Sequence, residues 1–411
     1  MRRRELLGLL GLSLVVPGLG GRNAHAGRGA PGSAAAFAGS NPVGTSATRP
    51  GGAGPRLVLV ELAGANDGLN TLVPRGNDHY RRLRPTIGID DAELLALDDA
   101  HGLHPALEPL MAAHAAGELA FVHGLGYPAP NRSHFRSIAL WERAGDGVSR
   151  MRASGWLTHA VEHGLGARRG DVDGMSLAGG LSLFASESGR WLSAESVAQL
   201  LVRAPSGPTA VLVDNANVSR MAERVTALDT TLARLRDRLE RAPDAAPLDG
   251  GELGEQLRHV TRLVAAGLDV PVFRVRLDGF DTHEHQPRRH AERLERLATA
   301  LDAFRRRMIA LGEWRDTVLM TYSEFGRRAT ENASGGTDHG TAAPHLVLGG
   351  RVAGGLYGDA PDLAPEALVD GDPVHTMDYR ALYERVLDGA LGAGDAHLAA
   401  YRDERLRTLF G

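Results

Sequence analysis

Four strand-like apolar segments that stop abruptly at polar side chains constrain this chain most. RLVLVEL (56–62) runs into a Gly-flanked turn that holds Asp67. ELAFVHGLG (118–126) leads to NRSHF, PVFRVRL (271–277) to DGFDTHEH, and DTVLMTY (316–322) to SEFGR. Nearly continuous β-forming runs are typical of strands buried on both faces of a parallel sheet. The pattern therefore predicts strands whose ends carry the chemistry.

Helical patterns lie between these strands, at about 104–117 and 288–311, and a further strand is expected at 344–350. This alternation predicts an α/β fold, a mostly parallel sheet sandwiched by helices. In such sheets, ligands bind outside the carboxyl ends of the strands. Side chains from distant parts of the sequence should therefore gather at one edge: Asp67, Ser133, Asp281, His283, His285 and Glu324. The charged, periodic stretch 218–242 is typical of a solvated amphipathic helix.

Composition excludes several kinds of chemistry. The chain has no Cys, and all 46 basic residues are Arg. Thiolate metal sites, cysteine nucleophiles and Schiff-base or phosphate-loop lysines are therefore excluded. A formal charge of −4 argues against a nucleic-acid partner. Any metal ion must be held by His, Asp, Glu, hydroxyl or carbonyl groups.

The first 26 residues are typical of an export signal. Three arginines precede an apolar run and an Ala24-His25-Ala26 cleavage pattern. The run is too short for a membrane span of about 20 residues. Arginine pairs before a mildly apolar segment resemble a twin-arginine signal, which exports folded proteins, and an ordinary secretory signal is the alternative. We expect a signal peptide (1–26), a Gly/Ala-rich linker (27–54), one domain (55–411) and a periplasmic or secreted protein.

Metal-ligand candidates cluster after the third strand. Asp281 and His285 are four residues apart, so a helix-like turn would put both side chains on one face. Carboxylate and imidazole groups bind zinc, and manganese or iron accept the same ligands. His283 could be a ligand, a supporting contact or a substrate contact. His339 lies between glycines in GGTDHG, where it could be a ligand or a loop histidine. His345, at the start of a strand, could be a ligand but is more often a packing residue.

The remaining candidates also have structural alternatives. Asp67 could form an Asn-Asp-Gly turn, and Ser133 could cap the helix that follows it. A helix N-terminus also eases formation of an alkoxide. Glu324 could hold a metal or start a helix, and Arg327 could bind an anion or Glu324 itself. No GxGxxG opens a helix after the first strand, and no GxSxG surrounds Ser133, so neither a dinucleotide site nor a Ser-His-Asp hydrolase is indicated.

Five ordered motifs carry a family resemblance: LAGANDGLNTLVP, RSHF, GFDTHEHQ, SEFGRR and GGTDHG. From about Arg56 to the C-terminus the chain resembles an exported bacterial family known as domain of unknown function 1501. That family in turn resembles the alkaline-phosphatase-like superfamily, whose members have a parallel α/β sandwich and two metal ions at the carboxyl edge of the sheet.

The resemblance implies a role for each matching residue. Asp67 would hold one metal ion, Ser133 would be the nucleophile, and Asp281, His285 and His339 would hold the other ion. Glu324 stands where an Asp-His pair is usual, and Phe325 replaces the histidine of that pair. His283 or His345 could compensate, or only one metal could bind. NRSHF lacks the C-x-P-x-R frame that sulfatases modify to formylglycine, so such a sulfatase is not expected.

These features predict an exported metal-dependent hydrolase of phosphate or related esters. Ser133 would attack, one or two divalent ions (zinc or manganese) would assist, and Asn70, Arg132 and Arg327 are candidates for holding the anion. The substrate would be a small-molecule or polymer ester. The alternative is a degenerate, non-catalytic member that binds a glycan, an anion or a protein partner.

Overall fold

The computed structural model describes residues 54–149, 151–158, 160, 170–180, 182–184, 190–201, 216–395 and 397–411. The expected signal peptide and almost all of the expected linker lie outside these residues. In the part of the chain that is described, no helix is both long enough and apolar enough to cross a membrane.

A nine-stranded sheet forms the centre, with β1 (Arg56–Ala63) between β8 (Val272–Asp278) and β9 (Thr317–Tyr322). β1 is parallel to both neighbours, with Val58 opposite Phe273 on one side and Leu319 on the other. The strand order is β13-β5-β12-β9-β1-β8-β6-β7, and β14 pairs with β5. The other strands are β5 (Leu119–Gly126), β6 (Gly174–Ser176), β7 (Trp191–Ser193), β12 (Ala343–Gly349), β13 (Gly355–Tyr357) and β14 (Met377–Asp378).

One strand departs from the parallel arrangement. β12 is antiparallel to both β5 and β9, so β5 and β9 share a direction and end at the same edge. The expected strand 344–350 thus exists, but a single apolar run carries no signal for its direction. The prediction of a mostly parallel sheet sandwiched by helices is confirmed.

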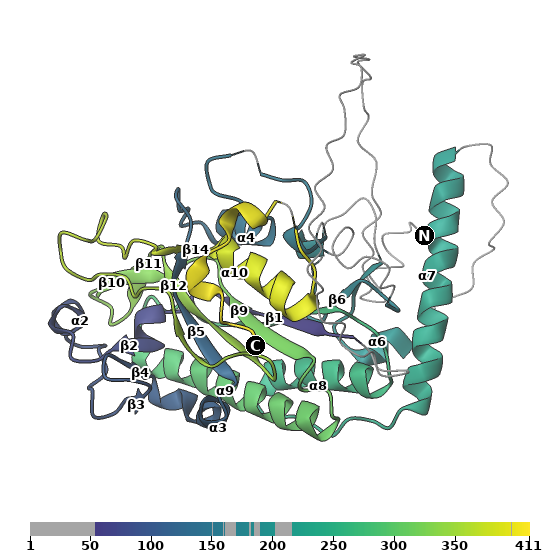
Figure 1. Cartoon of the computed structure of the whole chain (residues 1–411), viewed down its shortest axis with the longest axis horizontal. Coiled ribbons are helices and arrows are strands. Elements are labelled where there is room, and N and C mark those ends of the chain that lie inside the picture. Colours follow the sequence, from purple (N-terminus) through teal and green to yellow (C-terminus); the bar gives the residue numbers. More distant parts are fainter. Residues whose placement is uncertain are drawn as a thin grey trace, which may run out of the picture.

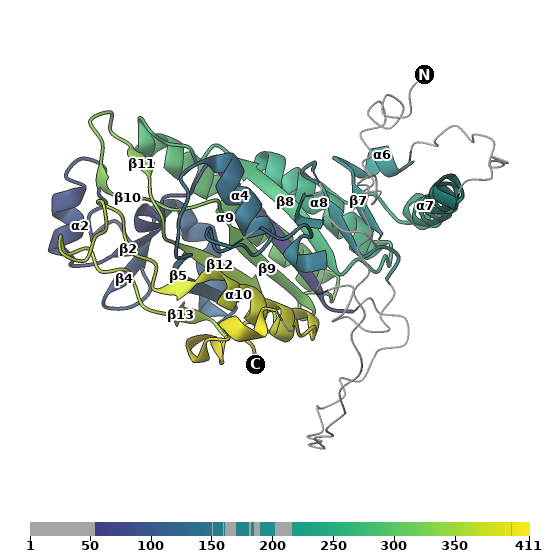
Figure 2. The same ribbon diagram turned by 90° about the horizontal axis from the view of Figure 1, so that it is seen from above.

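Helices cover both faces of the sheet, as Figures 1 and 2 show. On one face α8 (Gly251–Ala265) and α9 (Gln286–Ala310) pack with Val58, Val60 and Leu62 in one apolar core. On the other face α4 (His134–Glu142) and α10 (Tyr379–Val386) pack with Leu57 and Leu59 in a second core. β1 alternates between two buried cores, which explains its nearly continuous apolar sequence.

The expected helix at 218–242 is α7 (Ala216–Arg241), whose Leu232, Leu235 and Leu239 are buried. The expected helix at 104–117 divides into a 3₁₀ segment, η2 (Pro105–Leu110), and α3 (Met111–Ala115). β6 joins the sheet from a stretch in which the sequence pattern predicts no strand.

Small elements surround the edge where β1, β5, β8 and β9 end. β2 (Leu72–Pro74), β3 (Leu95–Ala96) and β4 (His101–Leu103) form a three-stranded sheet, and β10 (Arg327–Glu331) pairs with β11 (Thr337–His339). The remaining elements are η1 (Gly68–Asn70), α2 (Asp78–Leu83), η3 (Ser182–Phe184), α6 (Val197–Leu201), the π-helical η4 (Leu387–Leu391), η5 (Ala399–Tyr401) and η6 (Glu404–Leu406).

Candidate metal centre

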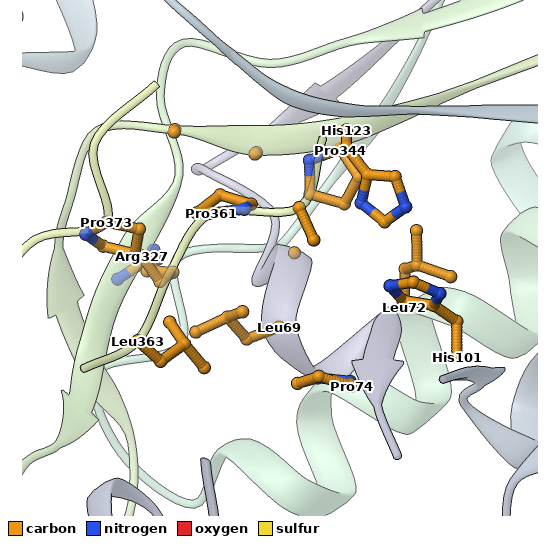
Figure 3. Close-up of a pocket in the computed structure, with 14 residues that line it drawn as sticks. Leu69, Leu72, Pro74, His101, His123, Arg327, Pro344, Pro361, Leu363 and Pro373 are labelled. Atoms are coloured by element: carbon orange, nitrogen blue, oxygen red, sulfur yellow. The ribbon is translucent and has the colours of Figure 1, made fainter. Parts of the chain in front are cut away.

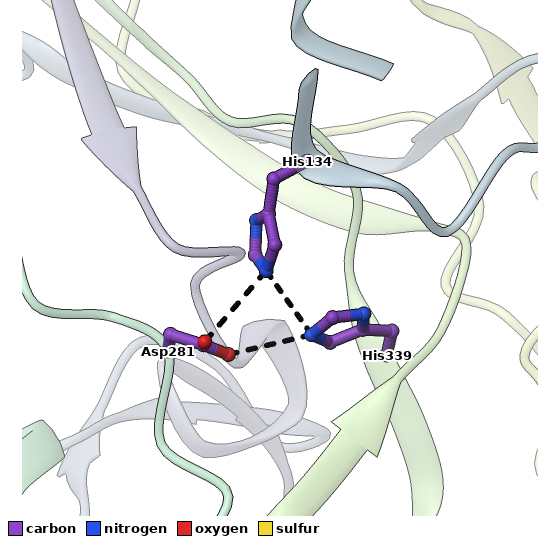
Figure 4. Close-up of side chains that lie close together, drawn as sticks. All are labelled: His134, Asp281 and His339. Carbon is purple, nitrogen blue, oxygen red and sulfur yellow. Dashed lines mark hydrogen bonds and ion pairs between the residues drawn. The ribbon is translucent and has the colours of Figure 1, made fainter. Parts of the chain in front are cut away.

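Four side chains from three parts of the chain converge at the carboxyl edge of the sheet: His134, Asp281, His283 and His339. His134 is the first residue of α4, after β5, and His339 ends β11. Asp281 and His283 follow β8. Figure 4 shows His134, Asp281 and His339 pointing toward one another, and these three form a group able to hold a metal ion.

The donor atoms lie close together. Nε2 of His339 is 3.1 Å from Nε2 of His134 and 2.9 Å from Nε2 of His283. Asp281 Oδ1 is 3.0 Å from Nε2 of His283 and 3.4 Å from Nε2 of His339, and Oδ2 is 3.7 Å from Nε2 of His134. His339 and Asp281 therefore each face both of the other histidines, His134 and His283.

The other ring nitrogen of each histidine faces an acceptor. Nδ1 of His134 is 2.9 Å from Glu324 Oε1, Nδ1 of His339 is 2.9 Å from the carbonyl oxygen of Arg132, and Nδ1 of His283 is 3.3 Å from Asp338 Oδ1. A proton on each Nδ1 satisfies these contacts, which assigns the tautomer from the network. Each neutral ring then presents an Nε2 lone pair toward another imidazole, an arrangement that a cation between the rings would stabilise.

The spacing fits a small divalent ion. Zinc binds imidazole at 2.0–2.1 Å, so two ligands of a tetrahedral zinc ion lie about 3.3 Å apart. The five separations that involve His339 or Asp281, from 2.9 to 3.7 Å, bracket that value. Imidazole and carboxylate donors suit zinc best, and manganese accepts them as well. The residues present therefore fit a divalent metal ion.

Glu324 supports His134 from behind. Its carboxylate accepts hydrogen bonds from the backbone N–H groups of Gly64 (2.9 Å) and Ala65 (3.1 Å) and from the Ser323 hydroxyl (2.9 Å). Burial acts to raise the pKa of Glu324, but the hydrogen bonds from His134 and the backbone outweigh it and lower the pKa. The hydrogen bond to Glu324 raises the pKa of His134. Glu324, predicted as a ligand, thus lies where it orients a ligand.

Two glycines allow the loops to approach this closely. A Cβ on Gly64, which has φ +109°, would lie 2.4 Å from the backbone nitrogen of Asp281. A Cβ on Gly336 would lie 2.3 Å from the backbone carbon of His283. Larger residues at either position would displace the loop that carries Asp281 and His283.

Phe325 is buried and forms an apolar wall of the group. Its ring centroid lies 4.9 Å from that of His134 and 4.8 Å from that of His339. The phenylalanine that replaces the expected histidine therefore packs against two of the imidazoles and offers no ligand atom.

Asp67 lies outside the group and is completely buried. Its Oδ2 accepts a 2.6 Å hydrogen bond from Nη1 of Arg84 and another from Gln286, and its Oδ1 accepts from the backbone N–H of Leu69. Burial acts to raise the pKa of Asp67, but the charge and hydrogen bond of Arg84 lower it. A guanidinium thus neutralises the carboxylate that the family resemblance assigns to a metal ion. Asn70, an anion candidate, accepts from the same Arg84 group at 2.6 Å.

Ser133 occupies the N-cap position of α4 and is exposed. Its side chain makes no capping hydrogen bond; Asn131 Oδ1 accepts instead from the Ser133 backbone N–H, at 2.9 Å. Ser133 therefore directly precedes His134 at a helix N-terminus. Arg132 is exposed and forms an ion pair with Asp372.

His285 and His345 are not brought to the group. His285 is exposed, has a left-handed backbone (φ 49°), and, unlike His283, its side chain makes no hydrogen bond or ion pair among the described residues. His345 is buried on β12, where burial lowers its pKa to about 3. Its environment is that of a packed core histidine, which is the alternative that its sequence position favours.

An apolar pocket lies near the centre, beside β2 and β4 (Figure 3). Leucines, prolines and alanines form most of its wall, and Arg327 lines it together with His101 and His123. The His123 ring is buried, and its Nε2 has no hydrogen-bond partner among the described residues. Burial lowers the pKa of His123 to about 4, so this histidine is neutral at physiological pH.

His134 is the residue of the group that our interpretation of the sequence missed. The RSHF motif contains both Ser133 and His134, but only Ser133 is named as a candidate from the sequence. The signal was available: a histidine that starts a helix just after a buried strand lies at the same edge as the other candidates. Arg84, in contrast, has no such signal, because α2 carries no motif.

The solved structures that match the chain are distant. The lipoteichoic acid synthase LtaP from Listeria monocytogenes matches at 10% identity and a TM-score of 0.36, over 87% of this chain and 77% of that one. The phosphonate monoester hydrolase of Agrobacterium radiobacter matches at 11% and 0.36, over 85% and 78%. The C-terminal periplasmic domain of EcEptC from Escherichia coli, in complex with Zn, matches at 9% and 0.34, over 74% and 77%.

No curated protein sequence matches the chain. A family model does match, over residues 55–390, and its description is "Protein of unknown function (DUF1501)". The match covers most of the chain, including all five motifs and every residue of the candidate metal group. The chain therefore belongs to the DUF1501 family.

Proposed function

We propose that this protein is a metal-dependent hydrolase of phosphate or related esters. The observation that carries the proposal is the group of three Nε2 atoms and the Asp281 carboxylate, in which His134 directly follows the exposed N-cap residue Ser133. Bound there, a divalent ion would polarise an ester oxygen and lower the pKa of a nearby hydroxyl.

The residues around the ion have separate tasks in this proposal. His134, Asp281, His283 and His339 hold the ion, and Glu324 keeps the His134 ring in the required tautomer. The Ser133 oxygen attacks the phosphorus, the alcohol leaves, and water then releases phosphate from the serine. The N-terminus of α4 favours the developing negative charge at Ser133.

The predicted export signal indicates where the protein would act. With the predicted cleavage after Ala26, the catalytic domain would act in the periplasm or outside the cell, on a small-molecule or polymer ester. N-terminal sequencing of periplasmic material checks this part: we expect the mature chain to begin near Gly27, and a soluble cytoplasmic product that retains Met1 would contradict it.

The experiment that tests the proposed function is turnover of a panel of aryl phosphate monoesters and diesters by chelator-treated protein, with and without added zinc or manganese. We expect activity only with metal. Ser133→Ala should keep its metal and its fold, because the hydroxyl makes no capping bond, and should lose activity by orders of magnitude. Ser334→Ala, at an exposed serine in the β10–β11 turn, is the matched control and should keep full activity.

The result for Ser133→Ala decides between two routes. If this variant kept wild-type turnover with full metal occupancy, the serine would not be the nucleophile. A wild-type protein that binds metal but turns over none of the panel would instead favour a second function.

That second function is a binding protein without catalysis. The Asp67–Arg84 pair favours it, because an expected metal ligand is already neutralised. In that case the same edge would bind an anionic or glycan ligand, and calorimetry with the intact esters would detect binding without product.

A further inference from the structure

Arg327 is a buried guanidinium surrounded by oxygen atoms. Its side chain is fully buried. Nε donates to the carbonyl of Ala65 at 2.8 Å, and Nη1 to that of Thr337 at 2.9 Å. Nη2 donates to the carbonyl of Phe280 at 3.0 Å and also to that of Gly64. Four carbonyls from three separate loops therefore hold the guanidinium in one place.

The same guanidinium contacts the candidate metal group through Asp281. Nη2 of Arg327 is 2.7 Å from Asp281 Oδ1, the oxygen that faces Nε2 of His283 at 3.0 Å. One carboxylate oxygen thus lies between a permanent cation and the point where an exchangeable ion would bind.

A second guanidinium plays the corresponding part at Asp67. Arg84 is fully buried and pairs with Asp67 at 2.6 Å, and its other nitrogens donate to the carbonyls of Ala329 and Arg328 at 2.9 Å. Both carboxylates that follow β1 and β8 are therefore paired with an arginine, which remains protonated at any pH that the protein survives.

The charges balance with one divalent ion. The carboxylates that contact the histidines or the two guanidiniums are Asp67, Asp281, Glu324 and Asp338. Their four negative charges face the two positive charges of Arg84 and Arg327, and the histidines that bind through neutral rings add none. One divalent ion neutralises the remainder, whereas a second would leave two positive charges in excess.

We infer that Arg327 is a resident cation that takes the place of a second metal ion and positions Asp281 for the first, so that each chain binds one divalent ion. This inference rests on the proposed metal site. Arg327 is a positioning residue in this account, since it acts through Asp281 and has no exposed surface. The arrangement makes the second positive charge independent of metal supply.

The decisive experiment is a zinc titration of the full-length, chelator-treated wild-type protein, followed by equilibrium dialysis and elemental analysis. We expect saturation at one zinc per chain. Two tightly bound ions per chain would overturn the inference and leave the proposed function intact. No bound ion would overturn both, so the two failures are distinguishable.

A variant tests the positioning role separately. Arg327→Ala should weaken zinc binding about 10- to 100-fold, the usual cost of removing a partner that orients a metal ligand. Added methylguanidinium should restore much of the affinity by entering the space left by the side chain. Arg305→Ala is the matched control, because it removes another partly buried arginine–carboxylate pair (Nε to Glu118, 2.6 Å) at the opposite end of β5.

Folded Arg327→Ala protein with wild-type zinc affinity would contradict the positioning role. A loss of zinc affinity in Arg327→Ala that methylguanidinium does not reverse would contradict it as well. So would a methylguanidinium effect of the same size in Arg305→Ala. If Arg327→Ala does not fold, the wild-type stoichiometry still decides the inference, because it requires no substitution.

Discussion

Asp67 and Asp281 occupy similar positions in the fold, but their side chains differ in burial and in the groups that they contact. Both follow neighbouring parallel strands, β1 and β8, at the same edge of the sheet. Asp67 is completely buried against Arg84, whereas the Asp281 side chain is 48% exposed and faces three imidazoles as well as Arg327. The comparison indicates that a carboxylate at the end of a strand can bind a metal ion only if the arginine that pairs with it leaves a carboxylate oxygen facing the metal site.

The largest expected effect follows from the Asp67 side of the comparison. Asp67→Asn leaves Arg84 buried without a counter-charge, which should lower the free energy of unfolding by roughly 3–5 kcal/mol. His283→Ala, at a half-exposed member of the metal group, should change it by less than about 1 kcal/mol. Denaturant unfolding of the metal-free proteins measures both values, and equal values would show that the two regions do not differ in this way.

The second effect distinguishes the group that contains His134 from the Asp281–His285 pair that the sequence spacing predicts. His134→Ala removes a donor from the group and should weaken zinc binding by more than the roughly 10–100-fold cost of losing a supporting partner. His285→Ala, four residues after Asp281 but outside the group, should leave it unchanged. Competition with a fluorescent zinc chelator gives both affinities. The reverse result would favour the Asp281–His285 pair that the sequence spacing predicts.

The third effect concerns Glu324. Glu324→Gln keeps the size of the side chain but removes the charge that faces Nδ1 of His134. Zinc affinity should fall roughly 10–100-fold, as for other outer partners of ligating histidines. If the loss equalled that of His134→Ala, Glu324 would have to be a direct ligand, as the sequence alone predicts.

The smallest expected effect is the pH dependence of stability due to His123, a core histidine whose pKa shifts in the opposite direction from that of His134. Burial lowers the pKa of His123 to about 4, so the unfolded chain binds the proton first as the pH falls below about 6.5. His123 therefore contributes full stability above that pH and loses it as the pH falls toward 4. At pH 5 the loss is on the order of 1–2 kcal/mol.

His123→Phe should remove this part of the pH dependence, which urea unfolding between pH 7 and pH 5 would measure. An unchanged slope would mean that His123 gains no protection from its surroundings. His134 should behave in the opposite sense in metal-free protein, because Glu324 raises its pKa.

The strands could be predicted because burial on both faces leaves a nearly continuous apolar run, as in β1 and β9. The shared edge could be predicted as well: of the residues expected there, Asp281 and Glu324 contact His134, and Asp281 also contacts His283. The direction of β12 could not, because pairing is a property of the neighbours. The pairing of Asp67 with Arg84 could not be predicted either. Arg84 is 17 residues further along the chain, at the end of α2, and no motif marks it.

The central claim is that His134, Asp281, His283 and His339 share one divalent ion. The most direct measurement is anomalous diffraction at the zinc edge from crystals of the protein grown with zinc. We predict one strong peak, about 2.0–2.2 Å from the three Nε2 atoms and an Asp281 oxygen. A map with no peak at this point, or with its peak beside His285 or Asp67, would contradict the account.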